Sequence, residues 1–113
     1  NGSLFQKGMK HPMEYIYISY LTHEEDDPAE SYVELDETHR ERRRVDLYDN
    51  GMCFAYGGIY GYSEALSKTP YPESPYGLNR PGEVDARPIS GEAFEAFWFQ
   101  LPERPTGFMD AIF

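Results

Sequence analysis

The pattern of hydrophobic and polar positions predicts β-strands over the first half of the chain, and the segment 14–22 is the clearest of them. In its sequence EYIYISYLT, Ile16 and Ile18 fall on one face of an extended chain, while Tyr15 and Tyr17 fall on the other. Because both faces carry apolar side chains, we expect a central strand that is covered at least partly on both sides.

A second alternating run, 31–36, follows an acidic loop that ends at Pro28, which cannot continue a ladder of hydrogen bonds. We expect Val33 and Leu35 to point inward. The outward row of this run contains Tyr32, Glu34 and Asp36.

A third run, 40–49, places Val45 and Leu47 on its buried row. The pair Asn50-Gly51 separates it from a fourth run, 52–56, and Asn-Gly between two strand-like segments is a strong hairpin signal. Short connections between successive strands predict an antiparallel meander of four strands.

The segment 84–87 adds a possible short edge strand, and Ser90 then begins a helix as its N-cap, with Glu92 in the first turn. One stripe of this helix is apolar and consists of Ala93, Phe94, Phe97, Trp98 and Leu101. Pro102 ends the helix, which is too short to be stable alone and must pack on the sheet. The predicted fold class is therefore α+β: an antiparallel meander sheet of four to five strands with one C-terminal helix packed on it.

The length of 113 residues fits a single domain, which we expect to span 9–113. Residues 1–8 are expected to be an expression-derived or processed segment. The single cysteine, Cys53, excludes an internal disulfide, so the cytoplasm is the expected compartment. No apolar run approaches the roughly 20 residues that a membrane-spanning helix requires.

The formal charge of −10, from 20 acidic and 10 basic residues, changes the picture of possible partners. Such a charge repels nucleic-acid backbones and anionic membranes, and it favours association with a basic protein. The competing interpretation is that the acidic residues serve solubility alone.

Motifs for catalysis or cofactor binding are missing from the sequence, so we expect no cofactor and no enzymatic activity. His23 and the acids that follow it are expected to form a solvated loop without a metal ion, since neighbours in sequence rarely converge on one ion. Cys53 is expected to be a buried, inert thiol. The alternative is a small enzyme acting on a nucleotide or RNA, in which His23 or His39 would share a pocket with Glu34 and Arg43.

Four arginines lie close together in this acidic chain, at positions 40, 42, 43 and 44. Strand alternation puts Arg42 and Arg44 on one face and Arg43 on the other. We expect Arg42 or Arg44 to pair with Glu34 or Asp36 on the neighbouring strand. Arg43, on the inward row, is expected to pair with a buried acid.

The surface features that remain are an acidic loop and a long loop rich in Tyr, Gly and Pro, which together predict a protein-binding face. The predicted partner-binding residues are Glu24, Glu25, Asp26, Asp27, Tyr60, Tyr62, Tyr71 and Tyr76. In the opposing interpretation, the tyrosines cap the sheet. A third possibility is a regulatory or scaffold domain that associates through its apolar tail, 108–113.

The chain contains two further motifs: YVELD at 32–36 followed by ERRRVDLYDNG at 41–51, and ISGEAFE at 89–95 followed by Trp98. They resemble the motifs of a family of small bacterial domains of unknown function. The resemblance covers roughly 15–100 and implies a small sheet with a C-terminal helix, but no catalytic residues. In the family a strand that ends in W-x-H-E precedes the first motif, and in this chain Leu21 stands in place of that tryptophan. The 58–81 loop also differs from the family's usual, shorter segment. Members are similar in size and charge to immunity proteins that neutralise bacterial toxins, so we expect an inhibitor of a basic toxin, such as a nuclease.

Overall fold

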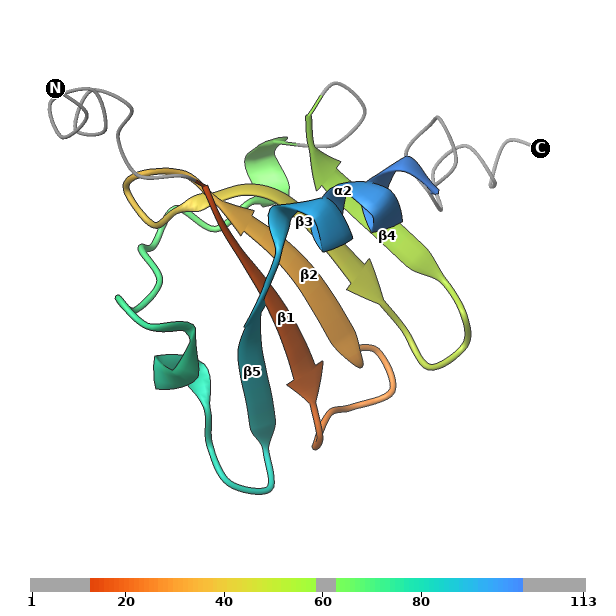
Figure 1. Ribbon diagram of the computed structural model, residues 1–113. Helices are drawn as coiled ribbons and strands as arrows, with labels where there is room; N and C mark the ends of the chain where they lie inside the picture. The colour runs from red at the N-terminus through yellow and green to blue at the C-terminus, as the bar shows by residue number, and fades with distance from the viewer. Residues whose placement is uncertain (1–12, 59–62, 101–113) are drawn as a thin grey trace, which may run out of the picture.

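The computed structural model describes residues 13–58 and 63–100, which form a five-stranded antiparallel sheet crossed on one face by a single helix (Figure 1). The strands are β1 (Glu14–Tyr20), β2 (Glu30–Leu35), β3 (Glu41–Leu47), β4 (Cys53–Gly57) and β5 (Val84–Ile89). Two short 3-10 helices, η1 (Ser63–Ala65) and η2 (Pro75–Leu78), precede β5, and helix α2 (Gly91–Phe99) follows it. The predicted α+β fold class is confirmed.

The order of the strands is β4-β3-β2-β1-β5. The four-stranded meander is thus extended beside β1 by a fifth strand that comes from much later in the chain. Each of the first four strands pairs with its sequence neighbour, and β5 pairs with β1. This arrangement makes β1 an inner strand between β2 and β5, as its two apolar faces predict.

One face of the sheet packs against the long connection between β4 and β5. Its buried core consists of Ile16, Ile18, Val33, Leu35 and Ala86. Tyr71 and Leu78, from the connection and from η2, pack against this core. Part of the Tyr/Gly/Pro loop is therefore a structural cover of the sheet.

The other face packs against α2, whose Phe94 and Trp98 are buried together with Val45 and Ala55 of the sheet. Ser90 begins the helix as predicted, because its side chain accepts a hydrogen bond of 3.0 Å from the backbone N–H of Ala93.

The prediction that Glu34 points outward to solvent is wrong, since its side chain is only 1% exposed. The face of β2 that carries Tyr32 and Glu34 lies beneath α2, and Tyr32 stacks on Phe97 with 4.2 Å between ring centroids. Alternation separated the two rows of β2 correctly. It could not show that both rows are covered.

A β-bulge interrupts the pairing of β2 with β3. Glu34 pairs with Arg43 and Leu35 pairs with Glu41, which leaves Arg42 as the extra residue. The Arg42 carbonyl approaches Gly57 of β4 so closely that a Cβ at this glycine would lie 2.3 Å from the oxygen. Gly57 also has a positive φ of 89°, so two independent constraints select glycine here.

Several expectations fall on residues outside the described ranges. These are the expression-derived or processed segment 1–8, the end of the predicted helical stripe at Leu101, and the tail 108–113. Among the described residues, no helix is long and apolar enough to cross a membrane.

Gly57→Ala should lower the free energy of unfolding by about 3 kcal/mol. The alanine would have to adopt the left-handed backbone conformation of Gly57, and its Cβ would collide with the Arg42 carbonyl oxygen. Gly51→Ala is the matched control, since Gly51 has the same φ of 89° but nothing within 4 Å of a Cβ. The control should cost only about 1 kcal/mol. Urea unfolding of both variants measures the difference, and equal losses would contradict the bulge geometry.

Candidate functional site at the acidic loop end

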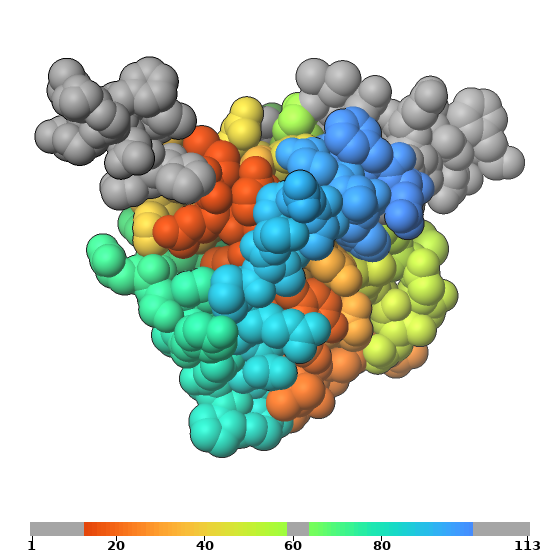
Figure 2. All heavy atoms as spheres, viewed as in Figure 1, coloured from red at the N-terminus to blue at the C-terminus, as the bar shows by residue number. Residues whose placement is uncertain are grey.

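Three connections meet at one end of the sheet, which we call the loop end: 21–29 between β1 and β2, 48–52 between β3 and β4, and 79–83 before β5. The backbone N–H of Leu21 donates to the Glu83 carbonyl at 2.8 Å, and the Thr22 hydroxyl donates to the Gly82 carbonyl at 2.8 Å. In Figure 2 the atoms of the first connection, in orange, lie beside those of the third, in teal, at the bottom of the molecule.

Seven exposed carboxylates gather at the loop end: Glu24, Glu25, Asp26, Asp27, Asp49, Glu83 and Asp85. Two of them have a basic partner, since Asp49 contacts His23 at 2.8 Å and Glu83 contacts Arg80 at 3.3 Å. Within the described residues, the other five make no ion pair. The loop end therefore presents a concentrated negative charge to solvent.

Apolar side chains are exposed among these carboxylates. Leu21 is 56% exposed, and Met52, in the connection between β3 and β4, is 37% exposed. Leu21 lines a hollow of about 250 Å³ together with Pro81, Val84 and neighbouring residues. Leu21 directly follows the last residue of β1, and the alternation of the 14–22 segment did not indicate that its side chain faces solvent.

His23 ties two of the three connections together. Its Nδ1 lies 2.6 Å from the Tyr20 carbonyl oxygen and its Nε2 lies 2.8 Å from Oδ2 of Asp49. The hydrogen bond to Asp49, and then that to the Tyr20 carbonyl, raise the pKa of His23 above its usual value. Among the described residues, no group of three or more His, Cys, Asp and Glu side chains could hold a metal ion.

One of the tyrosines predicted to accompany the acidic loop, Tyr71, lies at the other end of the sheet. The backbone N–H of Tyr71 donates to the His39 carbonyl at 2.7 Å, in the turn between β2 and β3, at the far end of the strands from the acidic loop. Its hydroxyl donates to Glu41, and burial, followed by the charge of Glu41, raises the pKa of Tyr71. Tyr76, in η2, is 58% exposed, while Tyr60 and Tyr62 lie outside the described residues. The structure does not bring Tyr71 to the acidic loop.

Arg43 pairs with a buried acid, as predicted from its place on the inward row. Its Nε and Nη2 donate to the two carboxylate oxygens of Glu34 at 2.6 and 2.9 Å, and Nη2 also donates to Glu95 of α2 at 2.6 Å. The guanidinium carbon lies 4.8 Å from the ring centroids of both Phe94 and Trp98. Burial alone would raise the pKa of Glu34, but the hydrogen bonds and charge of Arg43 outweigh it and hold the pKa below its usual value.

Arg44 belongs to a second polar cluster on the opposite face of the sheet. It contacts Glu41 at 2.5 Å and Asp46 at 3.1 Å, and the Ser31 hydroxyl donates to Asp46 at 2.7 Å. The expected cross-strand partners of Arg44, Glu34 and Asp36, are therefore wrong: its partners lie on its own strand. Of Arg42 and Arg44, Arg42 follows the expectation, with its Nη1 3.5 Å from Glu34.

The catalytic constellation considered as an alternative is not assembled. His23 lies at the loop end, while Nε2 of His39 lies 3.6 Å from Oε2 of Glu14 at the other end of β1. Glu34 and Arg43 bind each other beneath α2 and contact neither histidine. Cys53 is half-buried and not fully buried as expected, and burial raises the pKa of its thiol, which favours the protonated form.

The fold and the charge distribution define a small acidic α+β domain. The chain belongs to the family described as a domain of unknown function (DUF6881), whose family model matches residues 14–103. Searches of curated proteins and of solved structures found no significant match.

Arg43→Ala should lower the free energy of unfolding by about 3–5 kcal/mol, because it leaves the buried Glu34 carboxylate without its partner. Arg80→Ala is the control, since it breaks an exposed ion pair with Glu83 and should cost less than about 1 kcal/mol.

The stability of the wild-type domain should also depend on pH through Glu34. Because the pKa of Glu34 is depressed in the fold, the contribution of its carboxylate to the free energy of unfolding is present above the unfolded pKa and is lost as the pH falls through the folded pKa. Urea unfolding between neutral and acidic pH tests both points. Similar losses for the two arginine variants would refute the structural role of Arg43.

The imidazole of His23 should titrate above the pKa of a free histidine in an NMR pH titration. Asp49→Asn should return the pKa towards the ordinary value, whereas Asp27→Asn should change it little, because Asp27 acts only through its distant charge. Since the folded pKa is raised, the contact between His23 and Asp49 stabilises the loop end below the unfolded pKa of His23. That contribution disappears as the pH rises through the folded pKa. An unperturbed titration of His23 would show that the contact does not form.

Proposed function

We propose that this domain is an immunity-type inhibitor, which neutralises a basic bacterial toxin by covering the toxin's active site with its loop end. A nuclease is the class of toxin that fits best, since a site built to hold nucleic-acid phosphates offers Arg and Lys side chains to a negatively charged surface. The observation that carries the proposal is the set of five exposed carboxylates without ion-pair partners among the described residues.

The arrangement of the loop end fits the two requirements of such an inhibitor. Exposed carboxylates create a field that steers a basic partner towards this end and speeds association. Apolar side chains exposed at the loop end, such as Leu21 and Met52, supply surface that loses its water in the complex. An inhibitor of this kind would act in the cytoplasm, where a producing cell must protect itself.

A comparative pull-down tests the proposal. The wild-type domain should capture a basic protein from a bacterial lysate at low salt and release it at high salt. The Asp26→Asn/Asp27→Asn variant should capture less of the same protein. The captured protein should then lose its toxic activity, such as nuclease activity, when the wild-type domain is added. Capture without loss of activity would overturn the inhibitor role while leaving a binding role intact.

Once the partner is purified, Asp26→Asn/Asp27→Asn should slow association several-fold and change dissociation much less, because rim charges act mainly on encounter. Glu64→Gln is the control, since Glu64 is exposed on η1 at the opposite end of the sheet from the acidic loop (Figure 1). Stopped-flow mixing at two salt concentrations measures the rates. An unchanged association rate in the double variant would exclude the loop end as the steering surface.

A further inference from the structure

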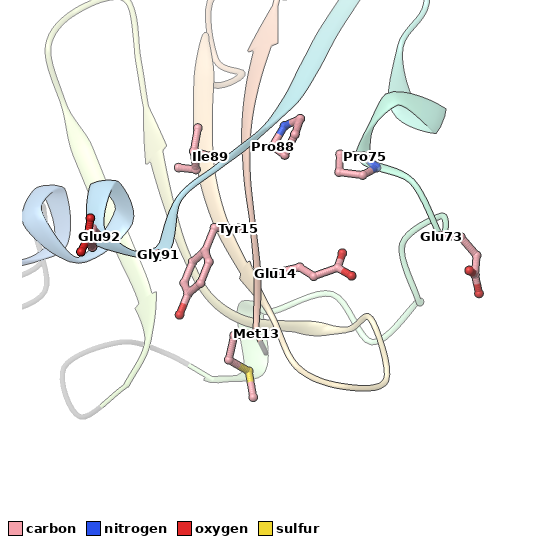
Figure 3. Close-up of a pocket in the computed structure, with 9 residues that line it drawn as sticks. All are labelled: Met13, Glu14, Tyr15, Glu73, Pro75, Pro88, Ile89, Gly91 and Glu92. Carbon is pink, nitrogen blue, oxygen red and sulfur yellow. The ribbon is translucent and has the colours of Figure 1, made fainter. Parts of the chain in front are cut away.

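A hollow of about 610 Å³ opens at the end of the sheet opposite the loop end, and we call it the turn-end hollow (Figure 3). The start of β1 supplies Glu14 and Tyr15, the end of β5 supplies Pro88 and Ile89, and the first turn of α2 supplies Glu92. Glu73, which lies before η2, and Pro75, the first residue of η2, form the opposite side. A smaller hollow of about 460 Å³ adjoins it, and the two share Glu14 and Glu73.

The apolar wall of the turn-end hollow is built by close packing. Tyr15 pairs across the ladder with Ile89, and its ring meets the ring of Phe94 edge-on, with 5.3 Å between centroids. A Cβ at Gly91 would lie only 2.9 Å from Cε1 of Tyr15, so the start of α2 is seated directly on this ring. Pro75 and Pro88 add stiff apolar surface. The wall is thus formed before any ligand arrives.

The rim of the turn-end hollow is acidic. The larger hollow is lined by the carboxylates Glu14, Glu73 and Glu92, and the smaller one adds Glu37. Figure 3 shows the Glu14 side chain extending from β1 towards the segment that carries Glu73 and Pro75. Among the described residues that line the two hollows there is no Lys or Arg, and the sole group able to become cationic is His39. Phosphates and other anions are therefore disfavoured.

We propose that the turn-end hollow binds a lysine or arginine side chain of a protein partner. The aliphatic stem of such a side chain packs on Tyr15, Ile89 and the prolines, and its cationic head lies beside the Glu14 carboxylate, on the side of the hollow that Glu73 lines. A bare metal ion would make no use of the apolar wall. A neutral apolar group would make no use of the rim. This site lies at the opposite end of the strands from the loop end, so it goes beyond the inhibitor proposal and does not depend on it.

An NMR titration of the full chain with Nα-acetyl-arginine amide and Nα-acetyl-lysine amide tests the proposal. Both compounds should shift the backbone amide signals of Tyr15, Ile89 and Gly91 in a saturable way, with a dissociation constant on the order of millimolar. Nα-acetyl-norleucine amide has a similar stem without the charge, and it should produce no saturable shift. Glu14→Gln/Glu73→Gln should weaken binding of the cationic compounds at least about tenfold.

A second pair of variants separates a specific site from general attraction to an acidic protein. Asp26→Asn/Asp27→Asn removes the same charge at the loop end and should leave the titration unchanged. Equal weakening by the two double variants would overturn the proposal, as would equal shifts with the norleucine compound or shifts confined to other residues. Loss of pull-down by Asp26→Asn/Asp27→Asn would have no bearing on these outcomes, so the two proposals fail separately.

Discussion

The buried contact between Glu34 and Arg43 is the interaction on which the arrangement of this domain depends. A carboxylate that is 1% exposed is tolerable only when its charge is matched, and the two-pronged hydrogen bonds from Arg43 provide that match. Arg43 in turn reaches Glu95 of α2, and the rings of Phe94 and Trp98 enclose its guanidinium group. The helix is thereby attached to the sheet in one orientation. Since the start of α2 forms one wall of the turn-end hollow, the shape of that hollow also depends on the buried pair.

The two sequence motifs that resemble the family gain a physical meaning from this contact. YVELD contains Glu34, ERRRVDLYDNG contains Arg43, and ISGEAFE with its following tryptophan contains Glu95 and Trp98. The motifs thus describe how α2 is held on the sheet. Neither the exposed acids of 24–27 nor Glu73 belongs to them. The motifs therefore account for the attachment of α2, and the two proposed binding surfaces lie in the connections between the strands.

Local patterns predicted the elements well because each depends on neighbours in sequence. Two-residue alternation located the strands, the Asn50-Gly51 pair located the hairpin, and the Ser90 cap located the start of α2. The burial of Glu34 could not be predicted in this way, since alternation separates the two faces of a strand without showing what covers them. Tyr71 was similarly misleading, because an aromatic residue in a Gly- and Pro-rich loop serves equally well as a surface anchor or as a cover of the core. The turn-end hollow combines residues from three separate segments of the chain, 13–15, 73–75 and 88–92, so no local sequence pattern predicts it.

The two acidic surfaces differ in how their charge can act. At the loop end, the carboxylates project into water, where salt screens their attraction over about 8–10 Å, so they favour fast and salt-sensitive encounter more than tight binding. At the turn-end hollow, Glu14 and Glu73 lie beside packed aromatic and proline surface, where a cation can lose water while its stem is buried. The first surface therefore suits long-range selection of a basic partner. The second suits recognition of one side chain, because a preformed wall fixes where that side chain must lie.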